Sequence, residues 1–293
     1  MKGIREIRRR IKAVKNTAQI TKAMQLVASS KMKRAQDAAL AGRPYALLLS
    51  QILESALQQM HETTHAFFES RPVKKRGILV IGTDKGLCGA LNGNTFRLIN
   101  DFKKEEAAFI CIGRKATQYI ARTGRELLAD FTVTDKVGYN EVRPIIEFLS
   151  QAYLDGKIDT IEVIYPNFIN TLRQDPALAP LVPFQSFESE LEKLNLRLGK
   201  RADEEIKDDR EIVFEPSAHA IINALPPLFL RHQIYQMIMS AKASEHSARM
   251  VAMKNATDNA KQLVADLSLE YNKARQAAIT QEILEIAAAS SAN

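Results

Sequence analysis

Residues 228–293 read LFLRHQIYQMIMSAKASEHSARMVAMKNATDNAKQLVADLSLEYNKARQAAITQEILEIAAASSAN, without one glycine or proline. Because these two residues are the strongest helix breakers, the uninterrupted run of 66 residues predicts a single helix, roughly 100 Å long at about 1.5 Å per residue. Few single domains could enclose such a helix. The sequence therefore predicts a rod in addition to any compact domain.

Residues 4–41 are equally free of glycine and proline, so a second long helix is predicted at the other terminus. The turn-rich sequence lies between the two helices. Average helices of globular proteins have only about 11 to 12 residues, and the pattern therefore favours a compact head that carries a helical rod. The alternative is that both segments are ordinary helices of a bundle.

Both terminal helices carry an apolar stripe. In the first, the spacing alternates between three and four residues, which is coiled-coil periodicity, and Gln25 is the polar exception; the stripe consists of Ile4, Ile7, Ile11, Val14, Ala18, Thr21, Ala28, Met32, Ala35 and Ala39. The stripe of the last helix is looser and rich in alanine, which permits close approach of two helix axes; it consists of Ile234, Ile238, Ala241, Ala248, Ala252, Ala256, Ala260, Leu263, Leu267, Tyr271, Ala274 and Ala278.

The simplest pairing of these helices is antiparallel, because one enters the middle region and the other leaves it. If Gly42 and Pro44 end the first helix, its 38 residues face 66, which leaves 28 residues, or roughly 40 Å, of the last helix without a partner. A lone helix gains little stability in water. We therefore expect the apolar end of the chain, with Ile283, Leu284 and Ile286, to need a sleeve supplied by another protein.

The positive charge is concentrated at the start of the chain. Residues 1–36 hold eleven lysines and arginines against Glu6, a net charge of +10, so the rest of the chain is net −3 out of a total of +7. A basic helix binds nucleic acid, an anionic membrane or an acidic protein surface, or is merely solvated. No aromatic residue interrupts the basic run to stack on bases, which favours an acidic protein partner over nucleic acid.

Composition excludes several classes of protein. A hydrophobic content of 46% is too high for a disordered chain, and no apolar run reaches the roughly 18 residues of a membrane span. The basic start lacks the apolar core of a signal peptide, so a soluble, non-exported chain is expected. Cys88 and Cys111 are the only cysteines, which indicates a reducing compartment and neither a disulfide framework nor a cysteine zinc site.

The middle region is predicted to be an α/β head. Three short apolar runs rich in β-branched residues, at 78–81, 109–112 and 161–165, are typical of buried strands. Segments with helical content alternate with them, as in an open, mostly parallel, Rossmann-like sheet; these segments are 94–106, 114–123 and 140–154.

Several other segments are interpreted from their prolines and charges. A second helix is predicted from Pro44 toward Ser70 and the long helix from Pro226 and Pro227. An edge strand is predicted at 212–214. The proline-containing stretch 174–183 and the charged stretch 188–211 are predicted to be loops. The resulting domains are 1–71, with the first helix of a coiled-coil shaft, 72–225, the head, and 226–293, the long helix of the shaft.

Two local motifs suggest chemistry. His61, Glu62 and His65 match the zincin pattern, in which two histidines hold zinc and the glutamate activates water. No further metzincin histidine follows the motif, and the alternative is a pair of exposed histidines at a polar helix end. The glycine-rich segment 82–93 follows a predicted strand, where open sheets bind phosphates, but its spacing fits neither phosphate-binding pattern and favours a tight turn.

The chain resembles the gamma subunit of F-type ATP synthases, of the bacterial type. The similarity lies in both terminal helices, in a head loop and in the turn 214–216, and it covers nearly the whole chain in order. The matching segments are KNTAQITKAMQLVA at 15–28, GTDKGLCG at 82–89, SEHSARMVAMKNATDNA at 244–260 and YNKARQAAITQE at 271–282. The charged stretch 188–211 is less typical of the family.

The resemblance implies the central-stalk rotor subunit of a proton-translocating ATP synthase. The antiparallel coiled coil would turn inside a ring of alpha and beta subunits, with the head on the membrane c-subunit ring beside epsilon. The chain itself would hold no cofactor or metal, bind no nucleic acid and catalyse nothing, since the chemistry belongs to beta. It would lie at the cytoplasmic face of the bacterial inner membrane, as a peripheral subunit associated with the membrane only through the complex.

The resemblance also assigns contact residues. Lys22, Met24 and Arg249 would lie near the acidic lever loop of beta. Residues toward the far end of the shaft would be Arg275, Gln276, Thr280 and Glu282. The basic face of the first helix, formed by Arg8, Arg9, Arg10, Lys12 and Lys15, would face that acidic loop. The rival interpretations are a basic coiled-coil scaffold or nucleic-acid adaptor, and a zinc hydrolase built on His61, Glu62 and His65.

Overall fold

The fold is described from a computed structural model of the chain, for residues 2–42, 45, 48, 49, 52, 65–69, 71–184, 215 and 218–291. They form two compact units. One consists of residues 1–30 and 249–293, and the other of residues 31–248. The elements are, in order, α1 (Lys2–Ala41), η1 (Ala66–Phe68), β1 (Arg76–Ile81), α3 (Leu91–Arg97), η2 (Leu98–Asp101), β2 (Ala107–Ile112), α4 (Arg114–Arg122), β3 (Glu126–Phe131), η3 (Tyr139–Val142), α5 (Arg143–Leu154), β4 (Thr160–Phe168), β5 (Gln174–Val182) and α7 (Ala218–Ser291).

The centre of the second unit is a five-stranded sheet in the order β3-β2-β1-β4-β5. Strands β1 to β4 are parallel, and β5 pairs antiparallel with β4. Helices connect the parallel strands, as βαβ crossovers require. The predicted α/β head is confirmed, and so are its three predicted strands.

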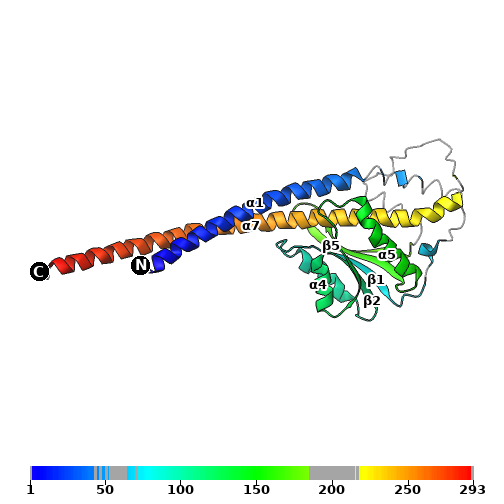
Figure 1. The fold of residues 1–293 in the computed structure, drawn as a ribbon, viewed down its shortest axis with the longest axis horizontal. Helices are drawn as coiled ribbons and strands as arrows, with labels where there is room; N and C mark the ends of the chain where they lie inside the picture. The colour runs from blue at the N-terminus through cyan, green and yellow to red at the C-terminus, as the bar shows by residue number, and fades with distance from the viewer. Residues whose placement is uncertain are drawn as a thin grey trace. The chain divides into compact units, whose positions relative to one another are not determined.

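Each face of the sheet is covered by helices. Alternate residues of β1 point to opposite faces: Ile78 and Val80 pack with Phe96 and Ile120 from α3 and α4. On the other face, Leu79 and Ile81 belong to a core that includes residues of α5 and of the first half of α7, namely Ile145, Leu149, Phe229, Leu230, Ile234 and Ile238. Figure 1 shows α4 and α5 on opposite sides of the sheet. Burial of both faces of the central strands β1, β2 and β4 explains why their sequences are continuous apolar runs.

The segment 174–183 is not a loop as predicted, because most of it forms strand β5. Its prolines Pro176 and Pro180 are exposed, and β5 is the edge strand of the sheet. An edge strand tolerates proline since one side of its backbone needs no ladder donor. The second unpredicted strand, β3, lies at the opposite edge.

The predicted start of the last helix at Pro226 is also wrong. Helix α7 begins at Ala218 and continues through both prolines. Leu225, Phe229 and Leu230 around them are buried in the core of this unit, so tertiary packing outweighs the helix-breaking effect of proline. At the other terminus, α1 confirms the predicted helix and ends just before Gly42.

The prediction of a helix from Pro44 to Ser70 falls largely outside the described residues, as do the strand 212–214, the charged stretch 188–211 and most of the turn 214–216. The final part of this predicted α-helix is wrong. His65 has an extended backbone and caps the short 3-10 helix η1, which follows it. Among the helices of the described residues, none is both long and apolar enough to cross a lipid bilayer.

Candidate functional site on the paired helices and head loops

In the first unit, α1 and α7 form an antiparallel pair, with both chain ends at the same end of the unit (Figure 1). The predicted stripe of α1 is confirmed. Within residues 2–30, the stripe positions from Ile4 to Ala28 and the polar Gln25 are all buried or half-buried. On α7 the stripe differs from the prediction, since Leu263 is 46% exposed and Val264 is half-buried in its place. The observed positions alternate by three and four residues, which is heptad spacing: Met253, Thr257, Ala260, Val264, Leu267, Tyr271, Ala274 and Ala278.

Two buried threonines fix the register of this pair. The hydroxyl oxygens of Thr21 and Thr257 lie 2.7 Å apart. Each also contacts a carbonyl of its own helix, that of Ala18 at 3.1 Å and that of Met253 at 2.8 Å. Both hydroxyls are therefore satisfied, as buried polar groups must be.

This register shortens the predicted unpaired tip. Since Thr21 faces Thr257, the antiparallel geometry places Lys2 opposite Gln276. Only residues 277–291 lie beyond the start of α1, a length of about 22 Å, rather than the predicted 28 residues. The difference arises because the first part of α7 packs in the core of the second unit. The short tip carries exposed apolar side chains: Ile279, Ile283, Leu284 and Ile286, with exposed fractions of 47%, 60%, 58% and 70%.

The predicted contact residues all belong to the first unit and separate into two groups. The first group consists of Lys22, which is exposed, and the half-buried Met24 and Arg249. The Lys22 ammonium donates to Oε1 of Gln25 at 3.3 Å. Arg275 and Gln276 lie at the level of the α1 N-terminus, and Thr280 and Glu282 lie beyond it. All four of these are exposed.

The predicted basic face is accessible throughout. Arg8, Arg9, Arg10, Lys12 and Lys15 are all exposed. Within this stretch Arg10 forms an ion pair with Glu6 at 2.7 Å, and both side chains stay largely in water, so the pair contributes little. The helix therefore buries one stripe and presents cations on the remainder of its surface.

The glycine-rich loop after β1 is held by its own side chains. Thr83, which is buried, accepts from Nδ2 of Asn92 at 2.7 Å and donates to the carbonyl of Lys85 at 2.8 Å. The N-terminal amides of α4 are also occupied: Lys115 N donates to the carbonyl of Thr83 at 2.9 Å and Arg114 N to Asp84 at 3.2 Å. These contacts support the interpretation of a tight turn.

The zincin motif is described only at its last residue, since His61 and Glu62 lie outside the described residues. His65 caps η1, and its Nδ1 accepts a hydrogen bond from the amide of Phe67 at 3.2 Å. Burial lowers the pKa of His65. In the part of the chain that the structure describes, no three histidine, cysteine, aspartate or glutamate side chains are grouped to hold a metal ion.

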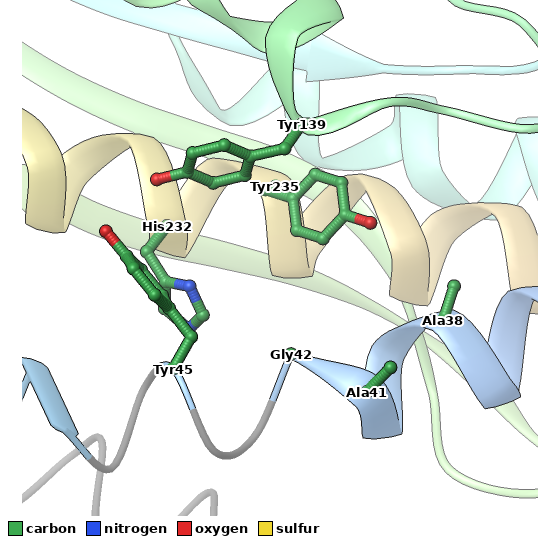
Figure 2. A pocket seen from close by; sticks show the side chains of 7 residues that line it. All are labelled: Ala38, Ala41, Gly42, Tyr45, Tyr139, His232 and Tyr235. Carbon is green, nitrogen blue, oxygen red and sulfur yellow. The ribbon is translucent and has the colours of Figure 1, made fainter.

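An aromatic cavity of about 360 Å³ lies in the second unit. Figure 2 shows Tyr45, Tyr139, His232 and Tyr235 around it, with Ala38, Ala41 and Gly42 of the α1 end forming another wall. The Tyr45 ring lies 5.5 Å from His232 and 6.0 Å from Tyr139, between centroids. Burial raises the pKa of Tyr139. Sequence patterns gave no signal for this cavity, because its residues come from three separate segments.

His232 makes the stability of this unit dependent on pH. Burial lowers its pKa to about 4, against 6.5 for the free side chain. The unfolded chain therefore binds a proton that the folded chain excludes between pH 6.5 and 4, and stability falls as the pH falls through this window. We expect His232→Gln to reduce this loss by about 3 kcal/mol at the acid end. Urea unfolding of the wild type and of His232→Gln from pH 8 to 4 tests this. If the free energies of unfolding of the two chains fell in parallel below pH 6, the prediction would be refuted.

A family model described as ATP synthase matches residues 3–292. The ATP synthase gamma chain of Opitutus terrae is 51% identical over 289 residues, covering 99% of this chain and 98% of the relative. That of Methylacidiphilum infernorum is 44% identical over 297 residues, with 99% and 98% covered. This chain belongs to the ATP synthase gamma-chain family. The predicted resemblance is confirmed.

Solved structures share the fold of this gamma-chain family member. A chain of the Euglena gracilis mitochondrial ATP synthase, in a structure of OSCP, F1 and c-ring, matches with a TM-score of 0.68 at 19% identity, covering 99% of this chain and 94% of its own. A chain of the Tetrahymena thermophila mitochondrial central stalk and c-ring matches with a TM-score of 0.58 at 25% identity, covering 81% and 99%. The similarity extends over the helices and the head.

Proposed function

We propose that this chain is the central-stalk rotor subunit of a proton-translocating F-type ATP synthase. The paired helices of 1–71 and 226–293 are the shaft, and the head of 72–225 engages the membrane c-subunit ring and the epsilon subunit. The observation that best supports the proposal is the exposed apolar end of α7, beyond the start of α1. Such a tip gains stability only inside a sleeve, and a ring of alpha and beta subunits supplies one.

In this proposal the chain performs no catalysis. An asymmetric shaft contacts each catalytic beta subunit differently, so its rotation changes nucleotide affinities through differential binding free energies. Lys22, Met24 and Arg249 contact the lever loop of beta, and Arg275, Gln276, Thr280 and Glu282 contact the upper sleeve. The subunit lies at the cytoplasmic face of the bacterial inner membrane, where it is held by its partners.

Co-purification tests the proposal. The chain, produced with the alpha and beta chains encoded by the same genome, should purify as one complex with a single copy of this chain and ATPase activity that depends on it. Elution of the chain apart from an active alpha–beta ring would contradict the proposal. Tight binding to nucleic acid would favour the adaptor alternative, and stoichiometric zinc the hydrolase.

The basic face provides a second test. Its cations are proposed to guide the acidic lever loop of beta without fixing one position, an effect that salt weakens. We expect the triple change of Arg8, Arg9 and Arg10 to glutamine to lower assembly or ATP-driven pumping several-fold at low ionic strength. The same loss of three charges at Lys103, Lys104 and Arg122, exposed residues of the head, should have little effect. Equal effects of the two triple variants would reject this role.

A further inference from the structure

Helix α7 is attached to the sheet of the second unit by both apolar and polar contacts. Its buried leucine, phenylalanine, isoleucine, methionine and alanine side chains between Leu225 and Ala241 belong to the main core. Three serines on the following turns then bond to the end of β4 and the loop after it. Ser240 donates to Asn167 at 3.1 Å, Ser244 to the carbonyl of Pro166 at 3.0 Å, and Ser247 to the carbonyl of Thr171 at 2.7 Å.

Besides the apolar contacts of Ala38 and Ala39 with the core, helix α1 is linked to this unit by an acidic side chain of a head loop. The ammonium of Lys31 donates to the carboxylate of Asp135, in the loop 132–138 between β3 and η3. This bond holds the pKa of the Asp135 carboxyl below its ordinary value, so the carboxylate stays ionised at neutral pH. Lys31 is the first residue of α1 that belongs to this unit.

The same carboxylate also faces α7. Asp135 lies 4.0 Å from Nζ of Lys242 and 3.9 Å from Nε2 of His246. Both of these side chains are buried, and Lys242 also lies 3.8 Å from the buried Glu245. Because a buried ammonium needs compensating charge, Asp135 and Glu245 together stabilise Lys242 inside the helix interface. Asp135 thus bonds or pairs with both helices at one place.

The loop that carries Asp135 is rigidly held. Val133 and Val137 on either side are buried in the core. The carboxylate of Glu141 accepts from Thr134 N at 3.1 Å, from the Thr134 hydroxyl at 3.0 Å and from Gly138 N at 3.0 Å. These bonds lower the pKa of Glu141. Asp135 is therefore presented by a fixed backbone and not by a flexible loop tip.

We propose that Asp135 is a positioning residue for torque transfer, which locks α1 and α7 together to the head through Lys31, Lys242 and His246. The proposal rests on the rotor function proposed above. Torque that enters through the head must reach both helices of the shaft. Helix α7 receives it through the core and its serines. The Lys31–Asp135 bond adds to the apolar contacts of Ala38 and Ala39 in passing it to α1 and prevents the two helices from slipping.

The test uses the complete enzyme in membrane vesicles driven by a fixed ion gradient. We expect Asp135→Asn to lower the rate of ATP synthesis about twofold or more, as changes in coupling contacts do, with an unchanged amount of assembled complex. Asp135→Glu should restore most of the rate. The control is Asp155→Asn, which removes an exposed carboxylate that pairs with Lys157 at 3.2 Å in the head, and it should behave like the wild type.

A second variant addresses the α1 link separately. Lys31→Met leaves Asp135 paired with Lys242 and His246, and we expect the same loss of synthesis. The double variant Lys31→Met, Asp135→Asn should synthesise ATP no more slowly than the more impaired of the two single variants. The reason is that both changes remove the same Lys31–Asp135 contact. Unchanged synthesis in Asp135→Asn, or failure of Lys31→Met to assemble, would overturn the proposal. Failure of the wild-type chain to assemble would instead refute the rotor function itself.

Discussion

Replacing Gly113 by alanine is expected to destabilise the head by about 2 to 6 kcal/mol. Gly113 joins β2 to α4 with φ 90° and ψ 137°, a conformation that costs a residue with a Cβ about 1–3 kcal/mol. An added Cβ would also lie 2.5 Å from the carbonyl oxygen of Gly82, which adds about 1–3 kcal/mol of overpacking. The neighbouring backbone cannot yield easily, because Gly113 N donates to the carbonyl of Phe131 at 3.1 Å.

Urea unfolding of the full chain, followed by circular dichroism, measures this effect. Gly86→Ala is the matched control, since a Cβ there would have nothing within 4 Å. The control should unfold with the wild type, while Gly113→Ala should unfold at clearly lower urea or fail to accumulate as folded protein. Coincident urea unfolding curves for the wild type and both variants would show that the connection between β2 and α4 is not close-packed.

Deletion of Thr280 to Asn293 is expected to leave the chain folded and to lower the torque of the assembled enzyme. In the described part of α7, these residues lie beyond the start of α1 and are exposed up to residue 287. Removal of residues 280–287 therefore breaks no helix-pair contact. In the complex, the deletion would remove the apolar tip from its proposed sleeve, along with the proposed contacts of Thr280 and Glu282. We expect the stall torque to fall to about half or less, since apolar burial supplies most of the binding free energy at such a contact.

A second variant separates the length of the tip from its chemistry. Ile283, Leu284 and Ile286, all changed to glutamine, keep the helix but remove its apolar surface, so this variant should also lose torque. Circular dichroism should show the secondary structure of the remaining chain unchanged in both variants. Collapse of the whole fold on deletion would contradict the register of the helix pair. Full torque in the glutamine variant would argue against an apolar sleeve.

The helix pair and the central strands could be predicted because local patterns dominate there. Alternation by three and four residues predicted the buried stripe of α1, and continuous β-branched runs predicted β1, β2 and β4. The errors came where tertiary packing overrides local preference. Strand β5 tolerates Pro176 and Pro180 at an exposed sheet edge, and α7 passes through Pro226 because Phe229 and Leu230 are anchored in the core.

The candidate site was only partly predictable. Exposure of the basic face and of the apolar tip followed from charge placement and helix length. The buried charges of α7 give a weak signal, because Lys242, Glu245 and His246 occupy interior positions of the helix where apolar residues would be expected. Asp135, the partner of Lys242 and His246, lies more than a hundred residues away in sequence, in a loop whose position depends on β3 and η3. No periodicity could have joined these residues.

Rotation of a probe on the head tests the central claim most directly. Leu172 is 83% exposed, and Leu172→Cys provides an attachment point. The natural cysteines Cys88 and Cys111 are buried, and burial raises the pKa of Cys111 to about 12, so labelling should favour the new thiol. With the alpha–beta ring fixed to a surface, ATP should drive the probe around in one direction in discrete steps. A probe that stays at one angle while the complex hydrolyses ATP would contradict the rotor function.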